Sequence, residues 1–471
     1  MKKSLTYLTL LVLTLFYACN GSKPAAEEAL PPYINVSYTV PKDLPSDASP
    51  ESLAKFAWEE LVALNWKSSF NSSQRRGQPD TTWNFGQSGA YPDLLVWETY
   101  AHRSELRPYY GQIQPFDNPP HYSFGNQPAP LPGTNARFDL FNNLDESNEI
   151  GSCNLYAYDT SQMVLYQAKV NRYEYDYIQQ YYGDSTSLAE AAARTQNNIS
   201  NLSAYCPECP TNCDCPQEAG VICLPCGGAE NEGSIEVKTA WRMLTDQDDH
   251  SRFYKDSVIY YEKGANGEIY YKNGVFGLIG IHIIHKTENY PTFIFASWEQ
   301  VDVTKANMEF ILLNGSAQPT GAPQTVERLH GVPPVIDTVN NNVHALLKKI
   351  NMESIWQYYR LIGVQSRPVN SIEEDPNYYM ANFVIESDST LANFHGSSIG
   401  KPFDGGKNTL YNKTFYNMGG CMGCHGATQL KGSDFSFLLD FAGKPVKDPD
   451  VIDLIPTEPS PKVKAYILGI Q

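Results

Sequence analysis

Five consecutive residues near the end of this 471-residue chain restrict its fold most: Cys421, Met422, Gly423, Cys424 and His425. C-x-x-C-H is the attachment sequence of a c-type haem, in which each cysteine sulfur adds across one haem vinyl group. The spacing puts both thiols on one edge of the ring, and the adjacent histidine then lies under the iron as proximal axial ligand. The alternatives are a chance C-x-x-C beside a histidine and one half of a zinc site. The motif therefore predicts one covalent haem c.

Glycines at positions 419, 420, 423 and 426 surround the motif. Glycine has no Cβ atom, so we expect these positions to leave room for a bulky ring against the backbone. A short helix is expected before the motif.

The sixth ligand of the iron is a separate question, because neither Met nor His follows His425. Met418 is too close to Cys421 to reach the opposite face of the ring. Met380 and His395 are the nearest remaining candidates, and Met380 is the preferred distal ligand; a thioether raises the potential relative to two imidazoles. A five-coordinate iron is the alternative.

The N-terminus indicates export. Lys2 and Lys3 precede an apolar stretch over 5–18, which is too short for a membrane-spanning helix and is typical of a signal peptide. Residues 1–18 are the predicted signal peptide and Cys19, after a small residue, is the predicted lipidation site. Ordinary secretory cleavage is the alternative. Residues 19–50, rich in Pro, Ala, Ser and Glu, are the predicted lipid-anchored tether. We expect a periplasmic or outer-membrane lipoprotein.

The net charge argues against negatively charged partners. The full chain carries a formal charge of −17, and removal of the predicted signal peptide takes two more lysines and leaves −19. This balance argues against nucleic acid and against an anionic membrane surface as partners. The length exceeds that of one usual domain, and we expect a body over 51–370 and a C-terminal cytochrome c-like haem segment over 371–471.

Six of the ten cysteines fall between positions 206 and 226: Cys206, Cys209, Cys213, Cys215, Cys223 and Cys226. Their spacing does not match the bacterial ferredoxin pattern. Disulfides are the usual state of cysteines outside the cytoplasm, so we expect a disulfide-stapled excursion, with a zinc knuckle as the alternative. Six cysteines allow fifteen pairings, and the sequence does not choose among them. Cys153 stands alone.

Apolar periodicity predicts an α+β fold: a mixed β-sheet body with flanking helices and a short helical C-terminal c-type haem segment. A helix is expected from Ser52, with Trp58, Trp66 and Trp97 as core anchors. Further helices are expected over 94–100, 173–192 and 353–365, the last part of a helical region from residue 345. Strands are expected over 154–159, 163–166, 257–262, 268–272, 275–287 and 292–302, with the last two central in the sheet.

Several polar residues are candidate site residues in the body. His282 and His285 lie three positions apart on an expected strand, so they point to opposite faces, and at least one is expected to be a satisfied core histidine. Five polar residues could gather at one edge of the sheet: His282, His285, Lys286, Glu299 and Asp302. Such a group would be either an active-site cluster or a buried ion-pair network, and the sequence leaves both interpretations open. His102 and Arg103 are expected to be a surface pair.

Blocks along most of the mature chain resemble exported bacterial cytochrome c family proteins of undefined role: 56–66, 96–99, 236–242, 280–287, 297–302, 356–361, 381–382, 421–425 and 434–437. Only the haem motif among them is chemically specific. Ser297-Trp298-Glu299-Gln300 departs from the Thr-Phe-Glu-His associated with this family, and the excursion 206–226 lies outside its pattern. The resemblance implies haem binding and electron transfer, with no defined substrate.

We therefore expect a mono-haem c-type cytochrome that transfers single electrons outside the cytoplasm to a partner protein that the sequence does not define. The large body leaves two alternatives, a periplasmic haem-linked oxidoreductase that binds substrate in the body and a haem-based ligand sensor.

Overall fold

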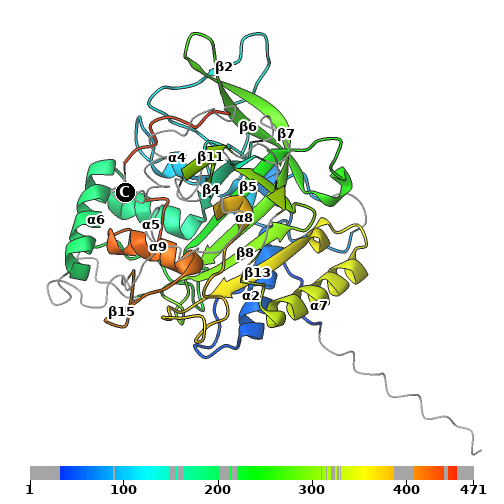
Figure 1. Ribbon diagram of the computed structural model, residues 1–471. Coiled ribbons are helices and arrows are strands. Elements are labelled where there is room, and N and C mark those ends of the chain that lie inside the picture. Colours follow the sequence, from blue (N-terminus) through cyan, green and yellow to red (C-terminus); the bar gives the residue numbers. More distant parts are fainter. Residues whose placement is uncertain are drawn as a thin grey trace, which may run out of the picture. The chain divides into compact units, whose positions relative to one another are not determined.

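The central strands of the chain pair into one eight-stranded sheet, which is antiparallel except for one short edge contact (Figure 1). The computed structural model describes residues 32–87, 91–147, 155–156, 163–200, 213, 220–308, 310–313, 316–319, 324–325, 328, 330–386, 408–439 and 444–452. The predicted signal peptide and Cys19 lie outside these residues. The predicted α+β fold is confirmed.

The order of the main strands is β1-β4-β5-β7-β8-β13. They span Ala101–His102, Leu165–Val170, Ile235–Met243, Ile269–His285, Ile294–Gln300 and Tyr359–Gln365. The first half of β7 also pairs with β6 (Lys255–Lys263) and with β2 (Ala129–Pro130), the latter in parallel. The two predicted strands over 268–272 and 275–287 are therefore one long strand. β7 and β8 are interior, as predicted, and all of β8 is buried, as expected for a strand covered on both faces.

One face of the sheet is covered by α2 (Pro50–Leu64), and α7 (Pro334–Ile350) lies beside α2 and β13. Trp58 of α2 packs edge-on against Trp298 of β8, with ring centroids 6.1 Å apart, and its Nε1 donates to Asn340 Oδ1 of α7 at 3.1 Å. The predicted helix start at Ser52 is two residues late. Ser49 is the N-cap, and proline at the first helical position has the backbone angle that a helix needs.

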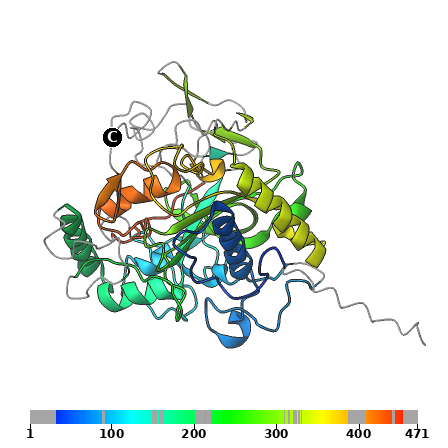
Figure 2. The ribbon, with the colours of Figure 1, turned by 90° about the horizontal axis from the view of Figure 1, so that it is seen from below.

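The opposite face is covered by the C-terminal part of the chain, which includes α8 (Phe383–Glu386) and α9 (Gly420–Leu430). Figure 2 shows α2 and α9 on opposite sides of the sheet. Asn382 donates from Nδ2 to Ser297 Oγ and to the Trp298 carbonyl, at 3.0 and 2.9 Å. The body and the haem segment predicted over 371–471 therefore lie in one compact unit, Ile34–Gln471, while Met1–Tyr33 is a separate unit.

The predicted tether over 19–50 is too long, because its second half belongs to the compact unit. Ile34 is 1% exposed. Lys42 donates from Nζ to the Ala229 carbonyl at 2.6 Å, and the Tyr290 hydroxyl donates to the Pro45 carbonyl at 2.7 Å. The composition of this stretch is typical of a tether, but its contacts are those of a folded segment.

Two helix predictions near the haem motif are wrong. The stretch 353–365 forms the short 3-10 helix η4 (Ile355–Tyr358) and then the edge strand β13, in which Leu361, Ile362 and Val364 are all buried. Consecutive apolar residues match a strand buried on both faces as well as a helix. Before the motif lies a hairpin, β14 (Thr409–Tyr411) with β15 (Thr414–Tyr416), and the helix begins at Gly420, one residue before the motif.

The helix predicted over 173–192 is two helices, α5 (Arg172–Tyr182) and α6 (Ser185–Ser200). The remaining elements are short: α3 (Phe70–Ser73), η1 (Trp97–Thr99), α4 (Arg103–Leu106), η3 (His250–Arg252), β3 (Leu155–Tyr156), β9 (Lys305–Met308), β10 (Phe310–Leu313), β11 (Ser316–Pro319) and β12 (Gln324–Thr325). Trp58, Trp66 and Trp97 are core residues, as predicted. Among the described helices, none has the length and apolar character needed to cross a bilayer.

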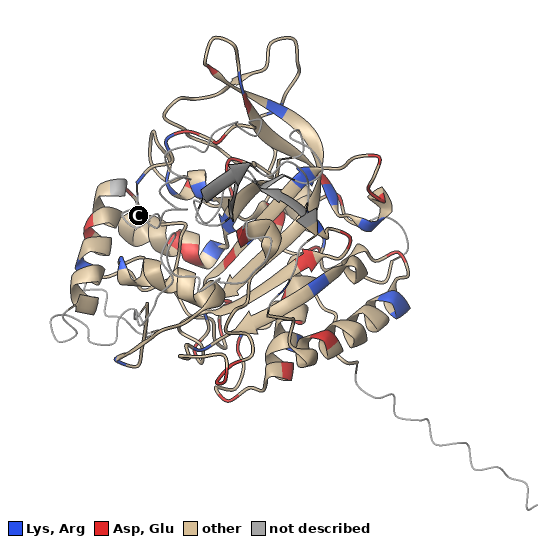
Figure 3. Ribbon diagram, viewed as in Figure 1, with Lys and Arg blue, Asp and Glu red and all other residues tan. Residues whose placement is uncertain are grey.

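His102 and Arg103 are not a surface pair. His102 is fully buried with Nε2 3.0 Å from Asp145 Oδ1, and Arg103 donates from Nε to the other oxygen of the same carboxylate at 2.9 Å. Elsewhere in the described chain, acidic and basic residues are interspersed (Figure 3).

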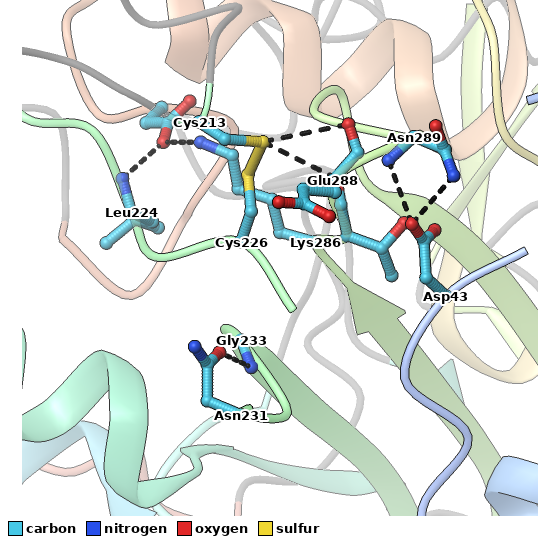
Figure 4. The surroundings of a disulfide bond; sticks show 11 residues. Asp43, Cys213, Leu224, Cys226, Asn231, Gly233, Lys286, Glu288 and Asn289 are labelled. Atoms are coloured by element: carbon cyan, nitrogen blue, oxygen red, sulfur yellow. Dashed lines mark hydrogen bonds and ion pairs between the residues drawn. A yellow bond between two sulfur atoms is a disulfide. The ribbon is translucent and has the colours of Figure 1, made fainter. Parts of the chain in front are cut away.

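Part of the cysteine-rich excursion is described, and Cys213 forms a disulfide with Cys226 (Figure 4). Cys223 is also disulfide-bonded. Cys213 Sγ lies 3.7 Å from the Thr287 carbonyl oxygen and 3.8 Å from that of Glu288, just after β7. Cys153, Cys206, Cys209 and Cys215 lie outside the described residues.

Candidate functional site

The haem motif occupies the first turns of α9, and Gln365 at the end of β13 holds it against the sheet. The Gln365 side chain donates from Nε2 to the Gly419 carbonyl at 3.1 Å and accepts from the Met422 N–H at 2.8 Å. The first N–H groups of a helix have no partner within the helix, so this acceptor completes the start of α9. Gly420 has φ +66°, and a Cβ there would lie 2.3 Å from Gln365 Nε2.

The glycines around the motif pack against protein. A Cβ at Gly426 would lie 2.3 Å from the Asn408 carbonyl oxygen, and one at Gly419 would lie 2.6 Å from that of Tyr378. The expectation that glycines leave room for the ring is therefore wrong at 419, 420 and 426, because main chain or side chain fills that space. These glycines fix the position of α9 instead.

Cys421 and Cys424 lie three residues apart on α9 and so share one helical face. Neither forms a disulfide. Cys421 is buried, and burial raises the pKa of its thiol well above the usual value. Both cysteines therefore lie outside disulfides, as thioether formation requires.

His425 is held in the orientation of a metal ligand. Its ring lies 4.9 Å from the Phe295 ring of β8 and 4.8 Å from the Phe437 ring. Nδ1 lies 2.6 Å from the Phe435 carbonyl oxygen, which can only accept, so Nδ1 carries the hydrogen and the Nε2 lone pair is available. Burial lowers the pKa of His425 to about 4, with a smaller contribution from Lys238, and keeps the imidazole neutral.

The loop after α9 positions the Phe435 carbonyl. Asp434 and Phe435 both have positive φ, +46° and +67°. Asp434 Oδ2 accepts from Lys286 Nζ and from the Leu224 N–H, each at 2.6 Å, and both side chains of the ion pair are fully buried. Figure 4 shows Lys286 and Leu224 close to the Cys213–Cys226 disulfide. The body therefore fixes the loop that orients His425.

His282 lies on the face of the sheet that α9 covers. One ligand atom from each of three buried residues, His282, Glu386 and Cys421, lies within 4.8 Å of the others. His282 Nε2 is 3.7 Å from Glu386 Oε1, and this buried nitrogen has no hydrogen-bond partner within the described chain. Burial lowers the pKa of His282 to about 3, with smaller contributions from Lys238 and His425, and so keeps the ring neutral.

His285 lies on the opposite face, as predicted, and is the satisfied core histidine. Its Nδ1 lies 2.8 Å from Glu60 Oε1 of α2, and Nε2 donates to the Glu232 carbonyl at 2.5 Å. The Glu60 carboxylate raises the pKa of His285 against the opposing effect of burial.

The predicted cluster at one sheet edge does not form, because its members have separate partners. Glu299 pairs with Arg328 and Arg360, while Asp302 pairs with Arg252 at 2.5 Å. At the position where the resembled family carries His, Gln300 accepts from two backbone N–H groups in the turn after β8.

Met380, the predicted distal ligand, is buried near the motif, and its carbonyl oxygen lies 3.8 Å from Cys421 Sγ. Its thioether packs on β13, where a Cβ at Gly363 would lie 2.8 Å from Sδ. Met418 is fully buried and accepts from the Val369 N–H. His395 lies outside the described residues.

The donor set fits a c-type haem: two thiols on one helical face and a neutral imidazole with its Nε2 lone pair available. Sequence reasoning missed Gln365, Asp434 and the Phe435 carbonyl. Of these, only Asp434 and Phe435 carried a signal, as part of a block that follows the motif. Comparison of the chain with protein-family models, with curated proteins and with solved structures finds no match.

Proposed function

We propose that the protein is an exported mono-haem c-type cytochrome that transfers single electrons outside the cytoplasm. The observation that carries the proposal is the position of His425 directly after two cysteines of one helical face, with Nδ1 committed to the Phe435 carbonyl. A metal-bound histidine usually has its other ring nitrogen committed to a carbonyl or carboxylate in this way, and here the commitment coincides with the C-x-x-C-H spacing.

Each part of the site has a role in this proposal. Cys421 and Cys424 would hold the ring and His425 would ligate the iron, and the bound haem would supply reversible one-electron chemistry. Phe295 and Phe437 pack against the imidazole and limit the movement of its ring. Burial and the hydrogen bond to the proximal imidazole are the features by which a protein sets the haem potential.

A lipid anchor on Cys19 would hold the protein at a membrane surface, in the periplasm or at the outer membrane, where the oxidising environment also suits the Cys213–Cys226 disulfide. The partner that delivers or accepts electrons is a second redox protein.

Covalent haem in denaturing gels tests the proposal. Wild-type protein from cells that assemble c-type cytochromes should retain haem-linked peroxidase stain, and the double variant Cys421→Ser/Cys424→Ser should lose it. Met422→Leu changes a buried residue of the same motif without touching the chemistry, so it should keep the stain. Covalent haem in the double variant, or none in the wild type, contradicts the proposal.

One observation favours a second candidate function. His282, Glu386 and Cys421 offer the imidazole, carboxylate and thiolate ligands of a single transition-metal site. In that case the purified protein would contain stoichiometric metal without porphyrin, and elemental analysis beside the haem stain separates the two functions.

The oxidoreductase and sensor alternatives keep the haem but add a ligand. Reduction of the haem by a candidate substrate would identify the enzyme, and a spectral change with ligand but without turnover would identify the sensor.

A further inference from the structure

The register of the sheet brings His282 to the haem motif. On β7, His282 pairs with Lys238 of β5 and with Ser297 of β8. Phe295, two residues before Ser297, points to the same face because side chains alternate along a strand. Phe295 contacts the His425 ring from the sheet. His282 on β7 and His425 on α9 therefore lie at the same part of this sheet face.

The side chain of His282 is built into this site and has an unused ligand atom. The residue is 9% exposed. Its Nε2 is buried without a hydrogen bond in the described chain, and the residue's ligand atom lies within 4.8 Å of Cys421 Sγ. Buried polar atoms in native proteins are almost always hydrogen-bonded, and an exception calls for a ligand or another specific role. His285, three residues on, differs in the distance to its carboxylate: its Nδ1 lies 2.8 Å from Glu60 Oε1, whereas His282 Nε2 lies 3.7 Å from Glu386 Oε1.

We infer that His282 would be a second protein ligand of the haem iron, in addition to His425. The inference rests on the proposed haem function. Neutral imidazole is the commonest metal ligand among side chains, and iron accepts it readily. A ligand on an interior strand is held by the hydrogen bonds of two neighbouring strands, so its position is fixed before the haem is bound.

Met380 is less well placed than His282. Its carbonyl oxygen, and not its thioether, is the group within 4 Å of Cys421 Sγ. The thioether fills the space above Gly363 on β13, where it packs as a core side chain. Ligation by Met380 would require this side chain to leave its packing site, whereas His282 has no hydrogen bond from Nε2 to break within the described chain.

Two imidazole ligands have chemical consequences. They give a lower reduction potential than one imidazole with one thioether. They also close the iron to added ligands, which favours electron transfer over the enzyme and sensor alternatives.

The test uses the optical and electron paramagnetic resonance spectra of the full-length haem protein. The wild type should be six-coordinate and low-spin, and reduced protein should bind carbon monoxide only slowly. His282→Ala should retain covalent haem, lose the low-spin ferric signal and bind carbon monoxide within the mixing time. Added imidazole should restore the low-spin signal in this variant. Met380→Leu is the matched control and should leave the spectra unchanged.

Two further variants keep the inference open to refutation if His282→Ala fails to fold. His282→Met retains the size of the side chain and should stay low-spin with a raised potential. Glu386→Gln should stay low-spin, since the carboxylate is a neighbour of the ligand. A low-spin His282→Ala protein without added imidazole, a high-spin wild type, or a spectral change in Met380→Leu or Glu386→Gln overturns the inference while leaving covalent haem in place. A wild type without covalent haem overturns the proposed function and the inference together.

Discussion

Removal of the Lys286 ammonium group should destabilise the protein strongly, because its partner carboxylate is inaccessible to water. Lys286 and Asp434 are both 0% exposed, and Nζ lies 2.6 Å from Oδ2. Removing one member of a buried ion pair leaves an uncompensated charge and costs about 3–5 kcal/mol. We therefore expect Lys286→Met to lower the free energy of unfolding by about 3–5 kcal/mol.

An ion pair near the surface provides the control. Lys272 and Glu262 form a contact of 2.9 Å, but their side chains are 28% and 37% exposed. Because solvent screens such pairs, Lys272→Met should cost less than about 1 kcal/mol. The two substitutions are chemically identical, so the difference between them measures the effect of burial.

Urea denaturation followed by tryptophan fluorescence measures both variants, since Trp58, Trp97, Trp241 and Trp298 are fully buried. A second substitution completes the cycle. Asp434→Asn removes the charge, keeps an acceptor for the Leu224 N–H and tolerates the positive φ at this position. Lys286→Met combined with Asp434→Asn should therefore cost less than the sum of the two single changes. A Lys286→Met protein as stable as Lys272→Met would refute the reasoning.

Two further predictions come from the structure and a third comes from the N-terminal sequence. Gly426→Ala should destabilise the protein and reduce covalent haem, because the added Cβ meets the Asn408 carbonyl, and this clash should outweigh the helix preference of alanine. Gly331→Ala is the control and should leave thermal unfolding unchanged, because nothing lies within 4 Å of the added atom. Burial raises the pKa of Glu236 to about 7 from its ordinary 4.5, so the folded state keeps a proton that the unfolded chain loses. Stability should accordingly fall by about 3 kcal/mol as the pH rises from 4.5 to 7, and Glu236→Gln should abolish this part of the pH dependence of urea unfolding; an unchanged slope would contradict the assignment. Cys19→Ser should block processing or release the protein from the membrane fraction, and an unchanged mature mass and distribution would exclude lipidation.

Local alternation and apolar density predicted the central part of the fold. The stretches 275–287 and 292–302 are interior strands, and the odd spacing of His282 and His285 correctly placed them on opposite faces. The same reasoning failed at 353–365, where a strand buried on both faces has no alternating pattern to distinguish it from a helix.

The parts that sequence could not predict depend on contacts between distant residues. In the sequence His102 has no feature that marks it as buried, and its contact with Asp145 is visible only in the folded structure. The Phe435 carbonyl has no side-chain signature, since any residue could supply it, and its position follows from an ion pair to Lys286 that is 148 residues away in sequence. The haem motif is the basis of the chemistry proposed for the site, while the groups that orient the motif became visible only in three dimensions.

The burial of Cys421 limits when its thiol can react. At 5% exposure, this thiol is out of reach of any large reagent or enzyme once α9 has closed on the sheet. The proposed attachment of haem at Cys421 would therefore come before closure or during a local opening of this segment. The rate at which Cys421 reacts with a thiol reagent in haem-free protein, compared with the more accessible Cys424, reports directly how often the segment opens.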